Sequence, residues 1–276
     1  YKDTINIALF GLDRRQKTDI SRSDSIMILT MDPYHKKLKL SSIMRDTYVN
    51  VDGHGMTKIT HAYAYGGPEL AIKTINENFN LNVKDYVTVD FYAMEKIIDK
   101  INGVEINVQP DELQYINSYI DEVSKIEKVT PNHVNSAGTQ SLDGRQAVAY
   151  ARIRYTAGGD FERTERQRTV LTQVFNKIKN QSKGDMLSVL NDLLPYTETN
   201  LGSIDIAKDG AKFLSMNINS VDQERFPVDG YCSGITVDGT WYLKTDLSVT
   251  SDQMRKYIFE DVKPTPKASL VNIPAK

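Results

Sequence analysis

Five arginines fall within one short stretch of the chain, between Arg152 and Arg168. Arg152 and Arg154 precede the glycine pair Gly158-Gly159, and the other three follow it. A guanidinium is planar, always charged and able to make two parallel hydrogen bonds to one phosphate, so this stretch suits an anionic phosphate ligand. A solvated, basic start of a helix is the alternative. Arg152 and Arg154 share a face only in an extended chain, which predicts that the preceding helix ends at about Ala151.

The segment after the glycine pair is expected to form an amphipathic helix. At about 100° per residue, Arg163 and Gln167 lie close to the face formed by the apolar positions between Val170 and Ile178. Burial of a charge is costly unless the charge is paired. An inward arginine therefore needs an anion, which is either a carboxylate of the protein or a ligand.

A second group of charged residues is expected at the ends of three strands near the start of the chain. Strands are predicted at 4–12, 24–32 and 38–44, because each of these segments is a short and nearly continuous apolar run. If consecutive strands are antiparallel, the end of the first, the start of the second and the end of the third meet at one rim. That rim would carry the charged residues Asp13, Arg14, Arg22, Asp24, Arg45 and Asp46.

Asp13 and Asp24 are the candidate metal ligands of this rim. Mg²⁺ is typically held by one or two carboxylates together with substrate phosphates. Aspartates at strand ends also serve as turn and capping residues, and this alternative stays open. The four histidines and the single cysteine, Cys232, show no ligand spacing, so we expect neither a metal site built on them nor an intramolecular disulfide.

Composition and pattern indicate an ordinary globular protein. Hydrophobic residues make up 40% and charged residues 25% of the chain, and the formal net charge of −2 argues against a nucleic-acid binder that acts through bulk positive charge. No run approaches the roughly 20 apolar residues of a membrane helix. Strands interleaved with helices predict an α/β fold, a three-layer α/β/α sandwich with a mixed, partly antiparallel central sheet. We expect one domain over residues 1–262 and a flexible C-terminal tail over 263–276.

Local patterns also predict individual elements. They are a pocket wall over 58–67 followed by a helix that begins at Pro68, a strand at 86–91, a loop over 130–139, a helix over 186–194 and a hairpin around Asp238-Gly239. No motif is recognised after about residue 180.

Three blocks of sequence resemble motifs of the LytR–CpsA–Psr family of bacterial cell-envelope proteins. The first is GLDR with RSDS (11–14 and 22–25), and the second is SIMRDT (42–47). The third is LDGRQA with YARIR and GDFERTERQ (142–147, 150–154 and 159–167). The blocks occur in the order of the family and cover roughly residues 5–175. One departure is Met44, where the family commonly has a proline, which should alter only local backbone stiffness.

The resemblance implies a Mg²⁺-dependent phosphotransferase on the outer side of the cytoplasmic membrane, usually of Gram-positive bacteria. Such an enzyme moves an anionic glycopolymer, a teichoic acid or a capsular polysaccharide, from an undecaprenyl-pyrophosphate carrier to peptidoglycan. The acceptor is the muramic acid 6-hydroxyl. The resemblance also implies an N-terminal membrane helix, expected before Tyr1, and an apolar tunnel for the lipid tail.

Roles for individual residues follow from the same motifs. By the resemblance, Asp13 and Asp24 bind the metal, and pyrophosphate is bound by Arg14, Arg22, Arg45, Arg152, Arg154, Arg163, Arg166 and Gln167. The candidates for catalysis are Arg45, Asp46 and Asp160. Either aspartate would deprotonate the acceptor hydroxyl or would pair with a neighbouring arginine. The lipid pocket is expected at Ile26, Ile28, Val87, Val89 and Phe91, although a packed core gives the same apolar pattern.

Two other functions fit the same residues. A polyprenyl-pyrophosphate hydrolase would use the same site with water as the acceptor. A non-enzymatic protein would hold anionic polymer or lipid through its arginines. Transfer of label from a lipid-linked donor to peptidoglycan separates the transferase from the hydrolase, and an effect of Mg²⁺ removal separates either enzyme from the binding protein.

Overall fold

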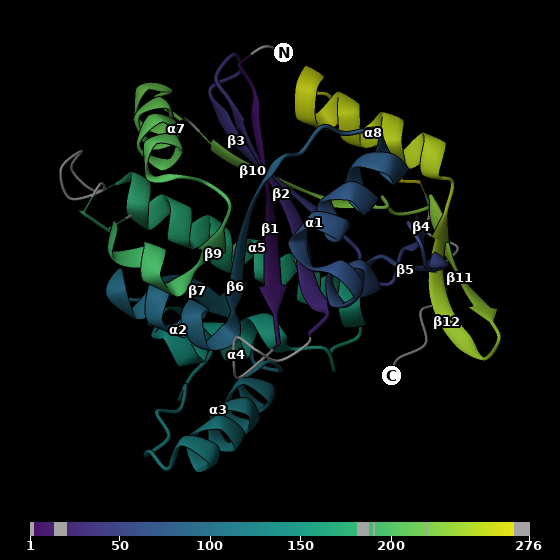
Figure 1. Cartoon of the computed structure of the whole chain (residues 1–276). Coiled ribbons are helices and arrows are strands. Elements are labelled where there is room, and N and C mark those ends of the chain that lie inside the picture. Colours follow the sequence, from purple (N-terminus) through teal and green to yellow (C-terminus); the bar gives the residue numbers. More distant parts are fainter. Residues whose placement is uncertain (1–2, 14–20, 181–187, 190, 219, 268–276) are drawn as a thin grey trace. The chain divides into compact units, whose positions relative to one another are not determined.

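The computed structural model describes residues 3–13, 21–180, 188–189, 191–218 and 220–267. These residues form two compact units. One unit comprises the described residues up to Asp90 and from Glu198 onward, and the other spans Phe91–Thr197. Figure 1 shows that both units combine helices and strands. The single domain predicted over residues 1–262 stays a prediction, and the predicted tail is described only as far as residue 267.

A mixed sheet forms the framework of the first unit. Its six strands are β1 (Ile5–Leu12), β2 (Ser23–Asp32), β3 (Lys37–Ile43), β6 (Asp85–Asp90), β9 (Glu198–Thr199) and β10 (Ser220–Phe226). Their order in the sheet is β10-β3-β2-β1-β6-β9. β2 is antiparallel to both β1 and β3, whereas β6 is parallel to β1 and β10 is parallel to β3. The predicted fold class, α/β with a mixed and partly antiparallel central sheet, is confirmed.

Helices α1 (Ile59–Phe79) and α8 (Leu247–Glu260) pack on one face of this sheet (Figure 1). The hydrophobic core lies between them and alternate residues of β1 and β2. The unit also contains α7 (Ser203–Ser215) and two hairpins. One hairpin pairs β4 (Tyr48–Val51) with β5 (Gly55–Lys58), and the other pairs β11 (Cys232–Val237) with β12 (Thr240–Thr245).

Two predictions for local structure in this unit have different outcomes. The hairpin expected around Asp238-Gly239 is confirmed, and both turn residues have positive φ values, 49° and 77°. The segment from Lys58 to Gly67 was expected to be a pocket wall outside a helix that begins at Pro68. Instead, α1 begins at Ile59 and contains a kink at Gly66 and Gly67, after which Pro68 opens its second part. Glycines supply the non-helical backbone angles of the kink, so the helical period continues on both sides of it.

The sheet divides the predicted lipid-pocket residues of its strands, which are Ile26, Ile28, Val87 and Val89. Ile26 and Ile28 belong to the closed core beneath α1. Ile26 pairs with Phe10, whereas Val87 pairs with the adjacent β1 residue Leu9 and is half-buried. Paired residues share a face and successive residues alternate, so the two isoleucines and the two valines lie on opposite faces. Assignment of all four residues to one pocket is therefore wrong, and only the valines stay candidates.

The second unit is organised around α4 (Gly144–Arg152). This helix contacts α2 (Phe91–Lys100), α3 (Leu113–Glu127) and α5 (Gly159–Lys179). A hairpin of β7 (Val104–Val108) and β8 (Gly138–Leu142) and the short 3-10 helix η1 (Leu194–Tyr196) complete the described elements. We expected a loop over Thr130–Thr139, but β8 begins within it and adds a strand that the sequence pattern did not reveal. The helix expected over Met186–Leu194 falls partly outside the described residues.

The LDGRQA motif is the start of α4. The Asp143 carboxylate accepts from the Gln146 backbone N–H at 2.9 Å, and the Gln146 side chain accepts from the Asp143 N–H at 3.0 Å. This reciprocal capping box satisfies helix N–H groups that would otherwise lack partners. A Cβ at Gly144 would lie 2.0 Å from the carbonyl oxygen of Glu95, so only glycine allows α4 to begin against the backbone of α2. The motif therefore fixes where α4 starts and hence where Arg152 lies.

Glu95 makes the stability of the second unit depend on pH. Burial raises the pKa of Glu95 to about 7, and this effect exceeds the attraction of Arg145, whose Nε lies 3.6 Å from Glu95 Oε2. Between the ordinary value of 4.5 and about 7, the unfolded chain is ionised while the folded protein keeps the proton. Stability is therefore lost as pH rises through this window.

We expect Glu95→Gln to remove this loss, which is on the order of 3 kcal/mol because one pKa unit corresponds to about 1.4 kcal/mol. Denaturant unfolding at pH 5 and pH 8 measures it. The matched control is Glu122→Gln in the exposed face of α3, which should keep the pH dependence of the unchanged protein. Equal pH dependence of Glu95→Gln and the unchanged protein would show that Glu95 is not the responsible group.

Candidate functional site

The predicted rim of the first unit forms where β1 ends, β2 begins and β3 ends. Leu12 at the end of β1 pairs with Ser23 at the start of β2, and the end of β3 lies beside this part of β2. Asp13, Arg22 and Arg45 thus belong to the same edge of the sheet. Arg14 lies outside the described residues.

A β-bulge sets the position of Asp24. Strand pairing passes from Gly11–Ser25 to Leu12–Ser23, so Asp24 is an extra residue in β2. A Cβ at Gly11 would lie 2.9 Å from Ser25 Cβ, which shows how closely the two strands approach next to the bulge. Bulges redirect side chains at strand ends, and Asp24 Oδ1 meets Arg45 Nη1 at 2.5 Å. Asp13 is exposed, and its carbonyl oxygen accepts from Ser21 Oγ at 3.4 Å.

Four alternating charges connect across the rim: Asp24, Arg45, Asp46 and Lys58. Arg45 Nε lies 3.9 Å from Asp46 Oδ2, and Lys58 Nζ lies 2.7 Å from Asp46 Oδ1. The four side chains are only 14–24% exposed, so these charges are partly shielded from solvent. Ion pairing is the alternative role that was left open for Asp46. Because Arg45 lies between Asp24 and Asp46, the array fixes the direction of its guanidinium.

Lys58 is a member of this array that the sequence analysis did not assign. The β4–β5 hairpin pairs Tyr48 with Lys58 and thereby returns the chain to the Arg45-Asp46 turn. The available signal was the Asp52-Gly53 turn, since extension of the pairing on both sides of it places Lys58 opposite Tyr48. Lys58 Nζ also lies 5.9 Å from the centre of the Tyr242 ring in β12.

Backbone hydrogen bonds hold the Arg45-Asp46 turn from two sides. The Leu243 N–H of β12 donates to the Asp46 carbonyl at 2.9 Å, and the Met44 N–H donates to the Phe226 carbonyl of β10 at 2.9 Å. A proline in place of Met44 would lack this donor. Met44 therefore does more than alter local stiffness, contrary to our expectation. The C-terminal third of the chain, in which no motif was recognised, supports the turn that carries Arg45.

The positive charges of the rim contribute to a lowered pKa of His61. Its Nδ1 lies 2.8 Å from Thr57 Oγ1. Burial, followed by the positive charges of Arg22 and Lys58, lowers the pKa of His61 below its usual value, and Asp46 offsets part of this effect. The exposed Arg22 and the half-buried Lys58 therefore act on the same region, and His61 is neutral at pH 7.

The arginine stretch of the second unit follows the predicted course. α4 ends at Arg152, one residue beyond the expected exit, and the backbone is extended at Ile153. Arg154 lies half-buried in the following non-helical segment. Gly159 has a φ of 54° and begins α5, so the glycine pair turns the chain between the two groups of arginines.

Arg163 and Gln167 are buried on α5, as their position near the apolar face predicted, and Arg166 is buried as well. Arg163 Nη2 lies 2.6 Å from Asp160 Oδ1, so a carboxylate of the protein lies next to this buried charge, and Asp160 is ion-paired. Of the two anions considered for an inward arginine, the described residues supply the carboxylate.

The Arg166 guanidinium is bound to the protein along its whole edge. Arg166 Nε donates to Glu112 Oε1 at 2.7 Å, and Nη2 donates to Thr156 Oγ1 at 3.0 Å and to Glu162 Oε2 at 3.2 Å. Nη1 donates to the Ile153 carbonyl at 3.4 Å. These contacts tie the segment after α4 to α3 and α5. They favour a structural role for Arg166 over the pyrophosphate-binding role implied by the resemblance.

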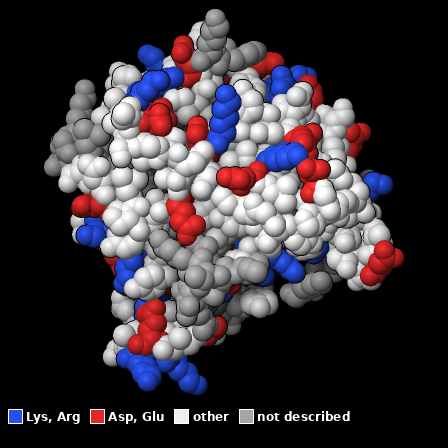
Figure 2. All heavy atoms as spheres, viewed as in Figure 1, with Lys and Arg blue, Asp and Glu red and all other residues white. Residues whose placement is uncertain are grey.

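Charges on the molecular surface are mixed. Figure 2 shows positive and negative side chains interspersed on the face in view, in agreement with the small net charge of −2. No helix among the described residues is both long enough and apolar enough to cross a membrane.

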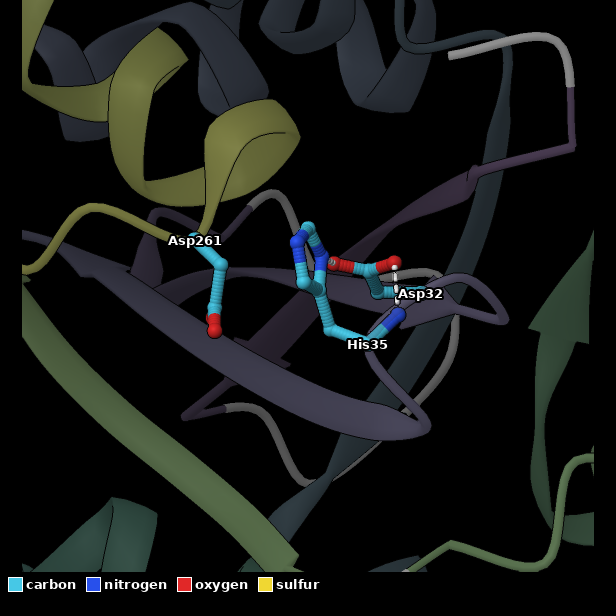
Figure 3. A group of neighbouring side chains, drawn as sticks. All are labelled: Asp32, His35 and Asp261. Carbon is cyan, nitrogen blue, oxygen red and sulfur yellow. Dashed lines mark hydrogen bonds and ion pairs between the residues drawn. The ribbon is translucent and has the colours of Figure 1, made fainter.

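A separate group of potential metal ligands lies at the other end of β2. Its members are Asp32, His35 and Asp261, and their ligand atoms lie within 4.8 Å of one another (Figure 3). Lys39 Nζ lies 2.7 Å from Asp32 Oδ2 and 3.1 Å from Asp261 Oδ1. Because this buried ammonium already bridges the two carboxylates, the group is an ion cluster of the fold. The described part of the rim contains no such group of three, so a cation there would need further ligands from a substrate.

This chain is similar in sequence to two known transferases. Polyisoprenyl-teichoic acid–peptidoglycan teichoic acid transferase TagT of Bacillus subtilis (strain 168) is 38% identical over 186 residues, which are 66% of this chain and 55% of TagT. The corresponding transferase TagU of Oceanobacillus iheyensis is 31% identical over 252 residues, 87% of this chain and 71% of TagU. The chain thus spans about half the length of TagT.

A solved structure matches nearly the whole chain. The LytR-CPS2A-psr family protein YwtF (TagT) with bound octaprenyl pyrophosphate lipid superposes with a TM-score of 0.69 and 29% identity, covering 93% of this chain and 91% of that one. The model of the LytR_cpsA_psr family matches residues 1–256. The chain belongs to the LytR–CpsA–Psr family.

Proposed function

We propose that this protein is a phosphotransferase that moves an anionic glycopolymer, such as a teichoic acid or a capsular polysaccharide, from an undecaprenyl-pyrophosphate carrier to peptidoglycan. The observation that carries the proposal is the match over 93% of the chain to a protein with bound octaprenyl pyrophosphate. The transferase names of TagT and TagU support the same reaction. The chain supplies arginines suited to this ligand in both of its units.

The chemistry requires orientation and charge stabilisation more than covalent catalysis. The acceptor hydroxyl, in our proposal the muramic acid 6-hydroxyl, attacks the phosphorus attached to the glycopolymer and forms a new P–O bond. The bond from that phosphorus to the bridging oxygen breaks, polyprenyl phosphate leaves, and the hydroxyl proton passes to a base. Negative charge grows on the leaving phosphate, where guanidinium groups stabilise it most.

Residue roles follow from the contacts around each charge. Arg45 is held between two aspartates and is proposed to bind the diphosphate, together with Arg22, Arg152, Arg154 and Arg163. Gln167, buried beside Arg163 on α5, is proposed to donate to a phosphate or to orient an arginine. Arg166 is proposed to position the segment that carries Arg154.

Asp46 and Asp160 are the proposed bases for the acceptor proton. Asp46 is paired with Lys58 at 2.7 Å, and Asp160 is paired with Arg163 at 2.6 Å. These cations hold both carboxylates in place. In this proposal, most of the acceleration comes from the arginines.

Mg²⁺ fits the donor set of the rim. Asp13 and the bulge residue Asp24 provide two carboxylates at neighbouring strand ends, and Mg²⁺ completes such a pair with phosphate oxygens. When bound, the ion would offset part of the diphosphate charge.

We further propose that the half-buried Val87 and Val89 contact the lipid tail. The protein would work at the outer face of the cytoplasmic membrane, anchored by a helix preceding Tyr1.

A transfer assay tests the proposal. The protein is incubated with a polyprenyl-pyrophosphate-linked saccharide that carries label in the sugar, with peptidoglycan oligomers and with or without Mg²⁺. We expect label on the oligomer, and at least tenfold less label when a chelator removes Mg²⁺. Release of the labelled sugar phosphate into water at the same rate without the acceptor would identify a hydrolase. Tight donor binding with no product at all would identify a binding protein. Arg255→Ala, at an exposed position of α8, is the control variant and should retain activity.

A further inference from the structure

Two aromatic rings lie next to the guanidinium of Arg152. Its Cζ atom lies 4.6 Å from the centre of the Phe91 ring and 4.5 Å from the centre of the Tyr119 ring. Distances within about 6 Å correspond to favourable cation–π contacts. All three residues belong to the second unit.

Three helices bring these residues together. Phe91 is the first residue of α2, Tyr119 lies in the middle of α3, and Arg152 is the last residue of α4. The Gly144 N–H at the start of α4 donates to Asp99 Oδ1 of α2 at 2.7 Å, and α4 contacts both α2 and α3. A short helix anchored at its first turn places its last residue at a fixed point, so the ring positions and the Arg152 position are set together.

Stacking constrains a guanidinium differently from hydrogen bonding. The N–H donors lie in the guanidinium plane, whereas an aromatic ring attracts its face. Rings this close to the half-buried Arg152 limit the rotation of its guanidinium and shield it partly from water, which strengthens its hydrogen bonds to an anion.

We propose that Phe91 and Tyr119 are positioning residues that set the plane in which Arg152 binds a phosphate of the diphosphate donor. This inference rests on the proposed function. It also gives Phe91 a role different from the lipid contact expected from the sequence. Phe91 was predicted in a strand with Val87 and Val89, but the strand ends at Asp90 and Phe91 begins a helix, with its ring against Arg152.

The test measures the affinity of the full chain for inorganic pyrophosphate by calorimetry. Tyr119→Leu and Phe91→Leu keep apolar volume but remove the ring, and each should weaken binding roughly three- to tenfold. Tyr119→Phe and Phe91→Tyr keep the ring and should stay within about twofold of the unchanged protein. In an Arg152→Ala background, Tyr119→Leu should cause no further loss, because its effect acts through Arg152.

A matched control lies next to Phe91. Tyr92 is 53% exposed and lies 5.1 Å from Lys96 Nζ, so Tyr92→Leu also removes a cation–π pair from α2. It should leave pyrophosphate affinity unchanged. Thermal unfolding of every variant identifies loss of fold, and the two leucine variants on separate helices serve as independent tests.

Several outcomes would overturn the inference. They are unchanged affinity in both leucine variants, equal loss in Tyr119→Leu and Tyr119→Phe, equal loss in Tyr92→Leu, or an undiminished effect in the Arg152→Ala background. If Phe91 instead contacts the lipid, Phe91→Leu should change the dependence on prenyl length and leave pyrophosphate affinity intact. Absence of transfer by an unchanged protein that still binds pyrophosphate would refute the proposed function and leave this inference standing.

Discussion

Replacement of Arg45 with alanine is expected to lower kcat/KM for transfer by about 10²–10³-fold, the usual effect of removing one preorganised donor to a developing oxyanion. The reason lies in the arrangement around Arg45. Asp24 lies 2.5 Å from Nη1 and Asp46 lies 3.9 Å from Nε, so the group is aligned before a substrate arrives. Initial rates with the lipid-linked donor and peptidoglycan oligomers measure the effect.

Arg45→Lys separates charge from geometry. Lysine keeps the positive charge but lacks the planar fork, so we expect activity between that of the alanine variant and the unchanged protein. Asp24→Asn removes one holding carboxylate and should lower activity through both the arginine and the proposed cation. A loss of less than about threefold in Arg45→Ala, beside an unaffected Arg255→Ala, would mean that Arg45 does not act on the transferred phosphate.

Lys39→Met is expected to destabilise folding by about 3–5 kcal/mol, because removal of one partner leaves buried charge without compensation. Lys39 is fully buried, and its ammonium donates to Asp32 Oδ2 at 2.7 Å and to the Tyr257 carbonyl at 3.0 Å. It thereby joins β2 and β3 to the C-terminal end of α8. Denaturant unfolding at pH 7 measures the loss.

The pH dependence of this loss gives a second readout. Burial raises the pKa of Asp32, but hydrogen bonds from Lys39 and His35 outweigh it and bring the pKa below its usual value. A lowered carboxyl pKa stabilises the fold above the unfolded value and ceases to do so as pH falls through the folded value. Without Lys39, Asp32 should take up a proton at higher pH, so the deficit should shrink as the solution becomes acidic.

The control for Lys39 is Lys73, whose ammonium pairs with Asp52 at the surface. Both side chains of that pair are about half exposed, at 49% and 58%. Lys73→Met should therefore leave the free energy of unfolding nearly unchanged. Similar losses in Lys39→Met and Lys73→Met would show that the buried cluster contributes no more than a surface ion pair.

Patterns among residues that are close in sequence correctly predicted the local features of this fold. The helical period placed Arg163 and Gln167 on the buried face of α5, and the two-residue spacing of Arg152 and Arg154 gave the end of α4 to within one residue. The apolar runs gave β1, β2 and β3, and strand direction then placed Asp13, Asp24 and Arg45 at one rim. These predictions hold because backbone geometry alone determines them.

Such patterns do not predict contacts between segments that are distant in the sequence. The Asp52-Gly53 turn indicates that Lys58 lies opposite Tyr48, but only the folded β4–β5 hairpin shows that the Lys58 ammonium pairs with Asp46. Nothing local indicates that Ile26 and Val87 face opposite sides of the sheet, because both lie in apolar runs and only the pairing of β1 with each neighbour fixes the faces. The burial of Lys39 likewise depends on α8, far away in the chain.

The sequence by itself determined the family, the mixed α/β fold and the identity of the charged residues in each motif, because these depend on residue type, order and period. Only the tertiary structure decided which charge each of them meets. Arg166 binds Glu112 and Glu162, and Arg152 lies next to the rings of Phe91 and Tyr119. The two arginines look equivalent in the sequence. Their surroundings differ because the helices that pack around each guanidinium come from distant parts of the chain, and only folding brings those side chains together.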